Sequence, residues 1–305
     1  MEGNQVSRTA LGAALMRGYH ALYESPRIFD DPLAYNLLTE EERTRISRYW
    51  LARLRSIDPS GAASCRDETS AVGRMLQLWT IASTVLSRAR FAEDALAEAA
   101  DRGVRQYVIL GAGMDTFAFR CPQMLDRLHV FEIDHPATQS FKRDRIAKLG
   151  WEIPAELHFV SLDFTKEGLD KMLTCPPYDP GALTFFSWLG VTYYLSRDNV
   201  FATLDAAARI SPRGSTIVFD YFDPNVYSTG KAAERVKAIK DTLESLGEPL
   251  KAGLDPSTLG SDLARIGLRL QENLAPLDIQ QRYFEGRTDC YHASGHTHFG
   301  LAVVE

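Results

Sequence analysis

The sequence predicts an α/β protein in which a doubly wound, mostly parallel sheet follows a helical N-terminal segment. Three observations predict this fold class. An apolar run over 108–110 leads into a Gly111-x-Gly113 turn. A second apolar run over 129–133 ends in acid at Asp134, about twenty residues further on. From residue 105 onwards, strand-like and helix-like patterns alternate, which is typical of parallel strands joined by crossover helices.

The first 68 residues predict a helical cap. Apolar residues recur at helical spacing from residue 10 to residue 22, and Thr39 with Glu42 forms the capping-box pattern of a helix start. The small and polar residues of 56–66 predict a loop, and 69–102 carries one long helical pattern. We therefore expect a cap over 1–68 and a sheet domain over 69–305, packed as one compact unit.

Five further strands are expected beside the two at the glycine turn. They are predicted at 157–160, 183–188, 216–221, 268–273 and 297–304. Helices are expected at 136–148, 197–209, 230–246 and near 255–266. The last two strands follow the end of the regular alternation, and one of them is expected to be antiparallel. The sequence therefore predicts a seven-stranded sheet.

Composition narrows the functional class. The chain has 305 residues, of which 45% are hydrophobic and 24% charged, as is ordinary for a globular protein. A net charge of −6 without a strongly basic run argues against nucleic acid as a main partner. No apolar run is long enough to span a membrane, and the N-terminus lacks a signal-peptide pattern. The four widely spaced cysteines argue against a structural zinc site and fit a reducing, cytoplasmic location.

The glycine turn followed by an acidic strand end is typical of a site for an adenosine-containing cofactor. Dinucleotide sites need a third glycine, where this chain has Thr116. The carboxylate of Asp115 is a poor neighbour for a pyrophosphate, but it is tolerable beside the cationic, phosphate-free S-adenosyl-L-methionine. These residues favour that cofactor over a nicotinamide or flavin. A dinucleotide-dependent oxidoreductase, or a turn that binds nothing, is the alternative.

Five segments together carry a family resemblance. The chain resembles the leucine carboxyl methyltransferase family, including its bacterial polyketide and natural-product O-methyltransferase branch, over roughly residues 8–304. The resemblance implies a class I methyltransferase (Rossmann-like) sheet, S-adenosyl-L-methionine as cofactor and S-adenosyl-L-homocysteine as product. The segments are Ser-Arg-Ala-Arg-Phe at 87–91, Leu-Gly-Ala-Gly-Met-Asp-Thr at 110–116, Phe-Glu-Ile-Asp-His-Pro at 131–136, Ser-Leu-Asp-Phe at 161–164 and Trp-Leu-Gly-Val-Thr-Tyr-Tyr-Leu at 188–195.

The resemblance implies roles for residues on the first two strands. Gly111 and Gly113 would pass close to the methionine moiety of the cofactor. Asp134, at the tip of the second strand, would accept hydrogen bonds from the ribose hydroxyls. Glu132 lies two residues earlier on the same face of that strand, so it is the second choice for this contact, with a structural ion pair as the alternative.

Further cofactor contacts are implied elsewhere. Asp163 and Phe164, after the third strand, would flank the adenine, and Arg88 would bind the cofactor's carboxylate. Leu189 departs from the pattern, because some family members have a glutamate there. Contact with the cofactor's amino group would then come from main-chain carbonyls near Gly111 or Ser187.

The methyl acceptor is expected to be a small molecule or a peptide. A carboxylate is already ionised at neutral pH, so its methylation by in-line displacement needs no base, only a cation that fixes the nucleophile. Arg17 on the first cap helix is the expected cation, ahead of Arg282 and Arg287. The expected product is a methyl ester.

A hydroxyl or phenol acceptor of secondary metabolism is the alternative, and it would need a base. His292 is then the candidate, within a cluster that also holds His296 and His298. Tyr193 is a further candidate catalytic residue, with a place in the core or the pocket wall as the alternative. No metal site is expected, because the histidines have no third ligand at metal spacing. A non-catalytic cofactor-binding protein is a further alternative, and the oligomeric state stays open.

Overall fold

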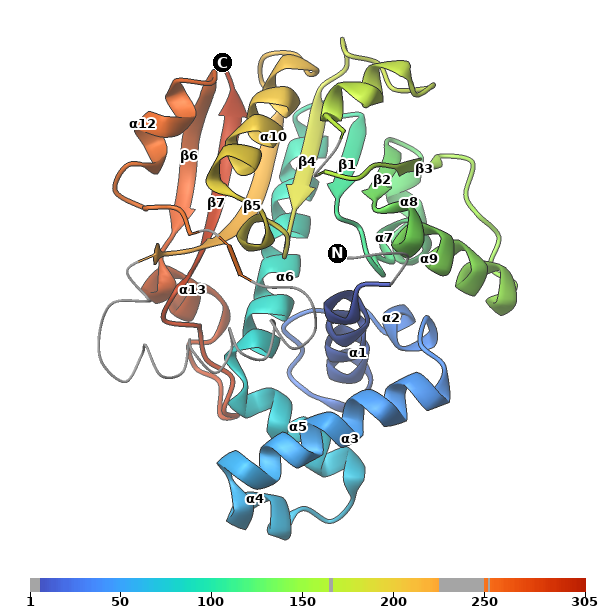
Figure 1. The fold of residues 1–305 in the computed structure, drawn as a ribbon, viewed down its shortest axis with the longest axis vertical. Helices are drawn as coiled ribbons and strands as arrows, with labels where there is room; N and C mark the ends of the chain where they lie inside the picture. Colours follow the sequence, from blue (N-terminus) through green and yellow to red (C-terminus); the bar gives the residue numbers. More distant parts are fainter. Residues whose placement is uncertain (1–5, 165–166, 225–249, 252) are drawn as a thin grey trace.

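The fold is seen in a computed structural model that describes residues 6–164, 167–224, 250–251 and 253–305. A seven-stranded sheet runs in the order β3-β2-β1-β4-β5-β7-β6, with helices on both faces and a helical cap below it in Figure 1. The predicted fold class is confirmed. The strands are β1 (Gln106–Leu110), β2 (His129–Asp134), β3 (Leu157–Ser161), β4 (Thr184–Trp188), β5 (Thr216–Phe222), β6 (Leu268–Leu274) and β7 (Thr297–Val304).

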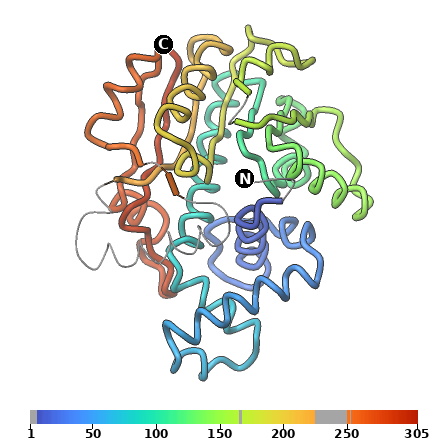
Figure 2. Tube along the Cα trace, in the orientation of Figure 1, coloured from blue at the N-terminus to red at the C-terminus, as the bar shows by residue number. Residues whose placement is uncertain are grey.

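Strand direction follows the expected pattern. β1 to β5 are parallel to their neighbours within that group, whereas β7 pairs antiparallel with both β5 and β6. β7, the last strand of the chain, therefore lies inside the sheet, between β5 and β6 (Figure 2). The strand order reverses between β1 and β4, which leaves a crevice at their carboxyl ends where ligands of open α/β sheets bind.

The central strand explains why the sheet is buried on both faces. All five residues of β1 are buried. Tyr107 and Ile109 face the apolar layer of α6 and the cap, while Val108 and Leu110 face the layer on the opposite side of the sheet. This alternation follows from the two-residue period of a strand.

The cap consists of short and long helices packed on one another. Its capping box at the start of α3 is confirmed, since Thr39 Oγ1 accepts from the Glu42 amide at 3.2 Å and Glu42 Oε2 accepts from the Thr39 amide at 2.8 Å. The helices of this part of the chain are α1 (Arg8–Tyr23), α2 (Leu33–Asn36), α3 (Glu40–Ile57), α4 (Pro59–Ser64) and α5 (Glu68–Leu78), followed by α6 (Thr80–Asp101).

Two expectations for the helices that precede β1 are wrong. The expected loop over 56–66 contains α4, because Asp58 caps it by accepting from the Gly61 amide at 3.0 Å and Pro59 stands at its first position. The expected single helix over 69–102 is two helices. They are separated at Trp79, whose backbone is extended with φ −101° and ψ 106°.

The remaining helices lie between and after the strands. The expected helix at 197–209 is confirmed, the one near 255–266 is shorter, and 230–246 lies outside the described residues. In the part of the chain that the structure describes, no helix is both long enough and apolar enough to cross a bilayer. The elements are α7 (Phe117–Arg120), α8 (Pro122–Leu125), α9 (Pro136–Leu149), α10 (Arg197–Arg209), α12 (Leu259–Ala264) and α13 (Pro276–Tyr283), with 3₁₀ turns η1 (Leu169–Thr174) and η2 (Thr192–Tyr194).

Candidate active site

A cavity of about 790 Å³ lies between the cap and the carboxyl ends of the strands. Its wall includes the glycine turn, the residues that follow β2, β3 and β4, and side chains of α1, α3 and α6. This volume falls within the range of about 300–1,000 Å³ that is usual for small-molecule sites. The cavity also coincides with the crevice at which the strand order reverses, so it is the candidate active site.

The glycine turn is held between the cap and the loop after β4. Gly111 has φ +70°, and a Cβ there would lie 2.5 Å from a methyl group of Val191. Gly113 has φ +54°, and its Cβ would lie 3.2 Å from that of Ala10 on α1. Side chains at these two positions would be strained and would crowd the cavity, so the turn requires glycine.

Asp134 lies against the glycine turn and lines the cavity. Its Oδ2 accepts from the amide of Gly113, and its Oδ1 accepts from the amide of His135 at 2.6 Å. Burial raises the pKa of Asp134, although the two amides act in the opposite direction. The structure thus brings together the turn and the acid that the sequence spacing predicts.

Glu132 does not line the cavity. It lies two residues deeper in β2, is 1% exposed and forms an ion pair through Oε2 with the ammonium of Lys142, which is equally buried on α9. Burial raises the pKa of Glu132 to about 7, with Lys142 opposing the shift. The side chain fits the structural alternative rather than a contact with a ligand.

Arg88 crosses the cavity from α6 to the ends of β4 and β5. Its Nη1 donates to the Tyr193 hydroxyl at 2.7 Å and to Asp220 Oδ2 at 2.8 Å. Asp220 Oδ1 also accepts from the amide of Gly190 at 2.6 Å. Burial alone would lower the pKa of Arg88, but Tyr193 and Asp220 raise it, so the guanidinium stays charged.

Arg88 has two side-chain partners, Tyr193 and Asp220. The sequence analysis leaves the role of Tyr193 open and does not identify Asp220. Tyr193 lines the cavity and stacks on Phe222 with ring centroids 4.5 Å apart. Burial raises the pKa of the Tyr193 phenol, which keeps it neutral. Asp220 was not anticipated. The available signal was a carboxylate inside the apolar run of β5, since such a residue needs a buried cation as partner.

The residues after β3 also reach the cavity. Asp163 and Phe164 both line it. Asp163 Oδ2 lies 4.0 Å from Nε2 of His135, and the ring of Phe164 lies 6.4 Å from that of Trp188. An acceptor of hydrogen bonds and an apolar ring therefore stand side by side at this end of the cavity.

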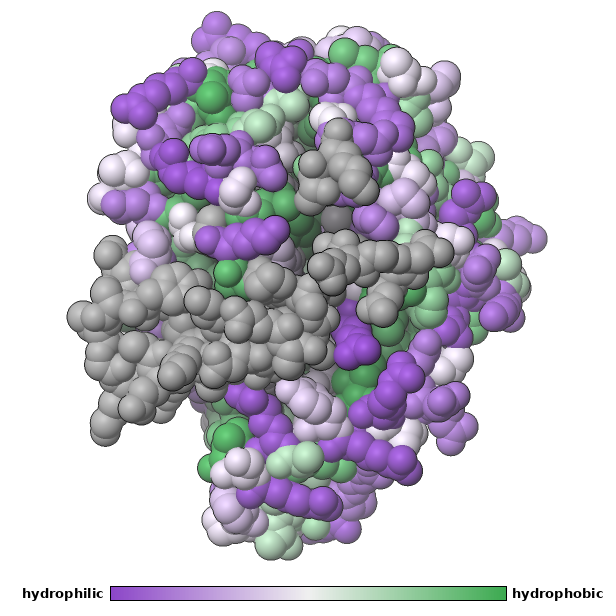
Figure 3. All heavy atoms as spheres, in the orientation of Figure 1, coloured by the Kyte–Doolittle hydropathy of each residue, from purple (hydrophilic) through white to green (hydrophobic). Residues whose placement is uncertain are grey.

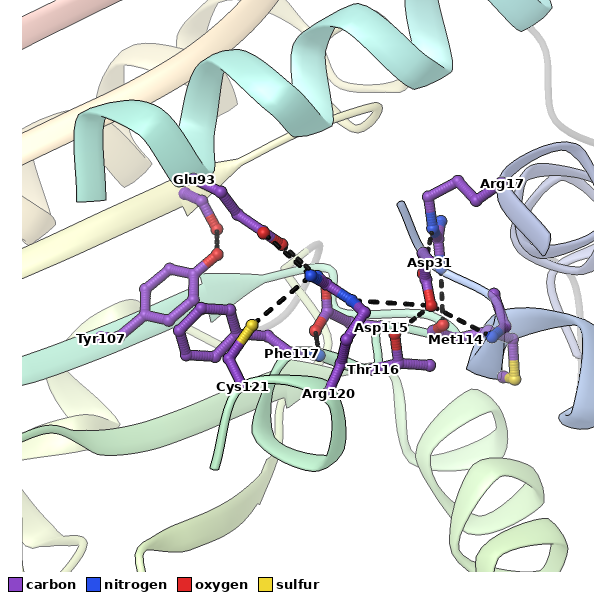
Figure 4. A network of polar contacts seen from close by, with 12 residues as sticks. Arg17, Asp31, Glu93, Tyr107, Met114, Asp115, Thr116, Phe117, Arg120 and Cys121 are labelled. Atoms are coloured by element: carbon purple, nitrogen blue, oxygen red, sulfur yellow. Dashed lines mark hydrogen bonds and ion pairs between the residues drawn. The ribbon is translucent and has the colours of Figure 1, made fainter. Parts of the chain in front are cut away.

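Arg17 lines the cavity but is held by two partners (Figure 4). Its Nε donates to Asp31 Oδ2 at 2.8 Å, and its Nη2 donates to the carbonyl of Met114 at 2.7 Å. Asp31 Oδ1 accepts from the hydroxyl of Thr116 at 2.5 Å. Burial would raise the pKa of Asp31, but Arg17, Thr116 and Arg120 lower it, so Asp31 is a carboxylate that ties the cap to the glycine turn.

The three histidines near β7 do not meet at the cavity. His292 is exposed, outside the lining, with Nδ1 at 2.9 Å from the carbonyl of Cys290. His296 does line the cavity, and burial lowers its pKa. His298 is buried and stacks on Tyr221 at 5.1 Å. In the described part of the chain, no group of three or more His, Cys, Asp or Glu side chains could hold a metal ion.

Arg282 and Arg287 also lie outside the cavity lining. Arg282 pairs with Glu272 at 2.9 Å. Arg287 pairs with Asp289 and donates to the carbonyl of Pro26 at 2.7 Å. Their guanidinium groups serve contacts between α13, β6 and the neighbouring loops.

Glu93 on α6 is a cavity residue that the sequence analysis misses. Arg120 holds it with both terminal nitrogens, with Nη1 at 3.1 Å from Oε2 and Nη2 against Oε1 (Figure 4). Burial raises the pKa of Glu93 to about 7, even though Arg120 opposes the shift. The helical pattern of the sequence did not identify Glu93, because its partner Arg120 lies on α7, beyond the glycine turn.

Glu93→Gln is expected to flatten the pH dependence of stability. With the pKa of Glu93 raised from 4.5 to about 7, the folded protein keeps a proton there that the unfolded chain releases. The stability that this proton contributes is fully present below 4.5, the pKa of Glu93 in the unfolded chain, and is lost as the pH rises through about 7. Urea unfolding measures the free energy of unfolding at about pH 5 and about pH 8. Between these two pH values, the wild type should lose on the order of 1–3 kcal/mol more than Glu93→Gln does.

Glu98→Gln, an exposed substitution on the same helix, is the control and should follow the wild type at both pH values. If Glu93→Gln and the wild type show equal pH dependence, the buried proton does not exist.

Comparison with solved structures identifies the class of fold. A protein from Thermobifida fusca YX assigned as a methyltransferase has a TM-score of 0.56 at 14% identity, over 95% of this chain and 94% of that one. A DUF574 family protein from Streptomyces avermitilis MA-4680 has a TM-score of 0.54 at 12% identity, over 96% and 97%. At such low identity the likeness concerns the fold alone, which is that of the class I methyltransferases.

Comparison of sequences identifies the family. The profile of the leucine carboxyl methyltransferase family matches residues 10–208. YktD of Bacillus subtilis (strain 168), assigned as an S-adenosyl-L-methionine-dependent methyltransferase, is 35% identical over 99% of each chain. A Parafrankia sp. (strain EAN1pec) protein with the same assignment is 31% identical over 84% of this chain and 75% of its own. The chain belongs to the leucine carboxyl methyltransferase family, which confirms the resemblance.

Proposed function

We propose that this protein transfers a methyl group from S-adenosyl-L-methionine to a carboxylate of a small molecule or peptide and forms a methyl ester. The observation that carries the proposal is the convergence of Asp134, Arg88 and the glycine turn on one cavity at the strand ends. Family membership and the assignment of YktD support this cofactor and this type of reaction.

The chemistry of the cavity wall fits S-adenosyl-L-methionine. The Asp134 carboxylate suits the ribose diol, and the Arg88 guanidinium suits the amino-acid carboxylate. Asp163 and Phe164 suit the amine and the ring of adenine. When bound, this cofactor supplies a methyl group on a cationic sulfur.

The charges at the strand ends also favour a cationic cofactor. The carboxylates that line the cavity there are Asp115, Asp134 and Asp163. Asp115 sits in the turn itself and accepts from the amide of Phe117 at 2.7 Å. A pyrophosphate would meet these carboxylates at close range, so the alternative of a dinucleotide-dependent oxidoreductase is disfavoured.

Methyl-ester formation asks the protein mainly for alignment and for exclusion of water. An acceptor carboxylate oxygen forms the new bond to the methyl carbon while the carbon–sulfur bond breaks and its electron pair stays on sulfur. No proton moves in this step, so no base is needed. The cap, held to the glycine turn by Arg17 and Asp31, covers the strand ends and shields the reacting atoms.

The hydroxyl alternative has one specific observation in its favour. His296 lines the cavity, and burial lowers its pKa, so it is a neutral imidazole able to accept a proton at neutral pH. It is a better placed base than His292, which stands outside the cavity lining.

The test uses S-adenosyl-L-methionine with a labelled methyl group and a panel of acids, each paired with a phenol of the same skeleton. Label that enters product and is released as methanol by alkali is a methyl ester and supports the proposal. Label that resists alkali is an ether and supports the hydroxyl alternative. Cofactor binding without transfer to any acceptor, across a broad panel, would indicate a non-catalytic cofactor-binding protein.

A further inference from the structure

The cap side of the cavity is charged differently from the sheet side. The acidic residues that line the cavity lie on the sheet side, at the strand ends and in the second half of α6. The cap contributes no acid to the described lining, and its helices α1 and α3 contribute cations. Figure 3 shows hydrophobic residues reaching the surface near the middle of one face, beside hydrophilic ones. An acceptor that enters under the cap therefore meets positive charge and apolar surface together.

One face of α3 supplies most of this contrast. Five of its residues line the cavity at spacings of one and three or four, so they form a single stripe on the helix. The α3 stripe consists of Arg45, Ile46, Tyr49, Trp50 and Arg53. An arginine stands at each end of the stripe, with one aliphatic and two aromatic side chains between them, and the stripe contains no carboxylate.

The aromatic part of the stripe is ordered by packing against the start of α6. Trp50 and Trp79 meet edge to face, with ring centroids 6.1 Å apart and planes at 73°. The guanidinium of Arg53 lies 5.8 Å from the centre of the Trp79 ring. Tyr49 is 45% exposed, so its ring stands at the rim rather than in the core. Tryptophan faces and guanidinium planes of this kind suit a flat aromatic ligand.

Basic residues elsewhere on the same helix do not share this placement. Arg48 and Arg55 are exposed and lie outside the cavity lining. Arginines thus occur on several faces of α3, and the stripe differs from the other faces in that its two arginines line the cavity.

The stripe lies away from the strand ends at which methyl transfer is proposed. α3 packs on α4 and α5, and Figure 1 shows α1 between α3 and the strands. A group of the acceptor that the stripe binds is therefore distinct from the methylated group and lies at the other end of the acceptor.

We propose that the α3 stripe selects the methyl acceptor and that this acceptor has a flat aromatic body with an anionic group at the end remote from the methylated one. Arg45 and Arg53 pair with the anion, while Tyr49 and Trp79 contact the ring. The inference rests on the proposed function, because it takes the cavity as the joint site of cofactor and acceptor.

The experiment measures ligand binding and needs no turnover. Full-length protein saturated with S-adenosyl-L-homocysteine is titrated by calorimetry with 2-naphthoate and with 2-naphthamide, its uncharged counterpart. The wild type should prefer naphthoate roughly ten-fold, as expected for one charge-assisted contact. The double variant R45Q/R53Q should lose this preference and keep its affinity for naphthamide.

The matched control is R48Q/R55Q, which removes the same charge from the exposed face of the helix. It should retain the preference for naphthoate. Both double variants should bind S-adenosyl-L-homocysteine like the wild type, which shows that they are folded.

Equal binding of naphthoate and naphthamide, an equal loss in R48Q/R55Q, or no binding of either probe would overturn the assignment of the stripe. Failure of the proposed function would look different. In that case the wild type would not bind S-adenosyl-L-homocysteine. Alternatively, it would bind S-adenosyl-L-homocysteine and naphthoate but transfer no methyl group to any acceptor.

Discussion

Lys142→Met is expected to lower the free energy of unfolding by about 3–5 kcal/mol. Lys142 and Glu132 form an ion pair with side chains 1% and 2% exposed. Without Lys142, the Glu132 carboxylate loses its charge partner, and its Oε1 already has no hydrogen-bond partner among the described residues. Urea unfolding at about pH 8 measures the loss. It should be smaller at about pH 6, because burial raises the pKa of Glu132 to about 7 and its neutral form needs no cation.

Two further variants make this result interpretable. Lys148→Met removes an exposed charge from the same helix, and its effect should stay within about 0.5 kcal/mol. The double variant Glu132→Leu/Lys142→Met should recover most of the stability, since apolar replacements of a buried pair are often neutral. A loss in Lys142→Met no larger than in Lys148→Met would contradict the buried pair.

Asp134→Asn is expected to weaken S-adenosyl-L-homocysteine binding by roughly 10–100-fold, because hydrogen bonds to a charged group contribute about 1.5–3 kcal/mol. The substitution also places an amide where the carboxylate now accepts from the amides of Gly113 and His135, which disturbs the glycine turn. Titration calorimetry measures the affinity.

The informative comparison for this variant is Glu132→Gln. That change should leave the affinity within about two-fold while it lowers stability, because Glu132 does not line the cavity. Asp144→Asn on the exposed side of α9 serves as a neutral control. If Asp134→Asn binds like the wild type, the ribose contact lies elsewhere.

The sheet was predictable because strand burial leaves a strong mark on sequence. β1 and β4 are mostly apolar and are buried over their whole lengths, as is typical of central parallel strands, and the expected strand at 297–304 matches β7. The errors concern helix ends. The cap of α4 depends on one side chain, Asp58, and the break at Trp79 has no proline or glycine to mark it. The start of α4 is a local signal, Asp58 followed by Pro59, that the small and polar composition of 56–66 obscured, whereas the break at Trp79 has no such local signal.

The candidate site was predictable where its residues are close in sequence. The glycine turn and Asp134 belong to one strand–turn–helix–strand unit, so their spacing was sufficient. Glu93 and Asp220 were missed because their partners, Arg120 and Arg88, come from distant elements. His292 was placed by its nearness in sequence to β7, but the direction of a side chain in a loop follows no periodicity. The assignment of roles to these residues remains a prediction.

The contacts of Arg17 and Asp31 have a consequence for engineering acceptor choice. A designer who exchanges caps between relatives to change the acceptor would cut the hydrogen bonds from Arg17 to the Met114 carbonyl and from Thr116 to Asp31. A grafted cap must therefore bring an arginine and an aspartate at these two places, or the receiving turn loses its support. A chimera that takes the cap and residues 111–116 from the same parent keeps both hydrogen bonds without this requirement.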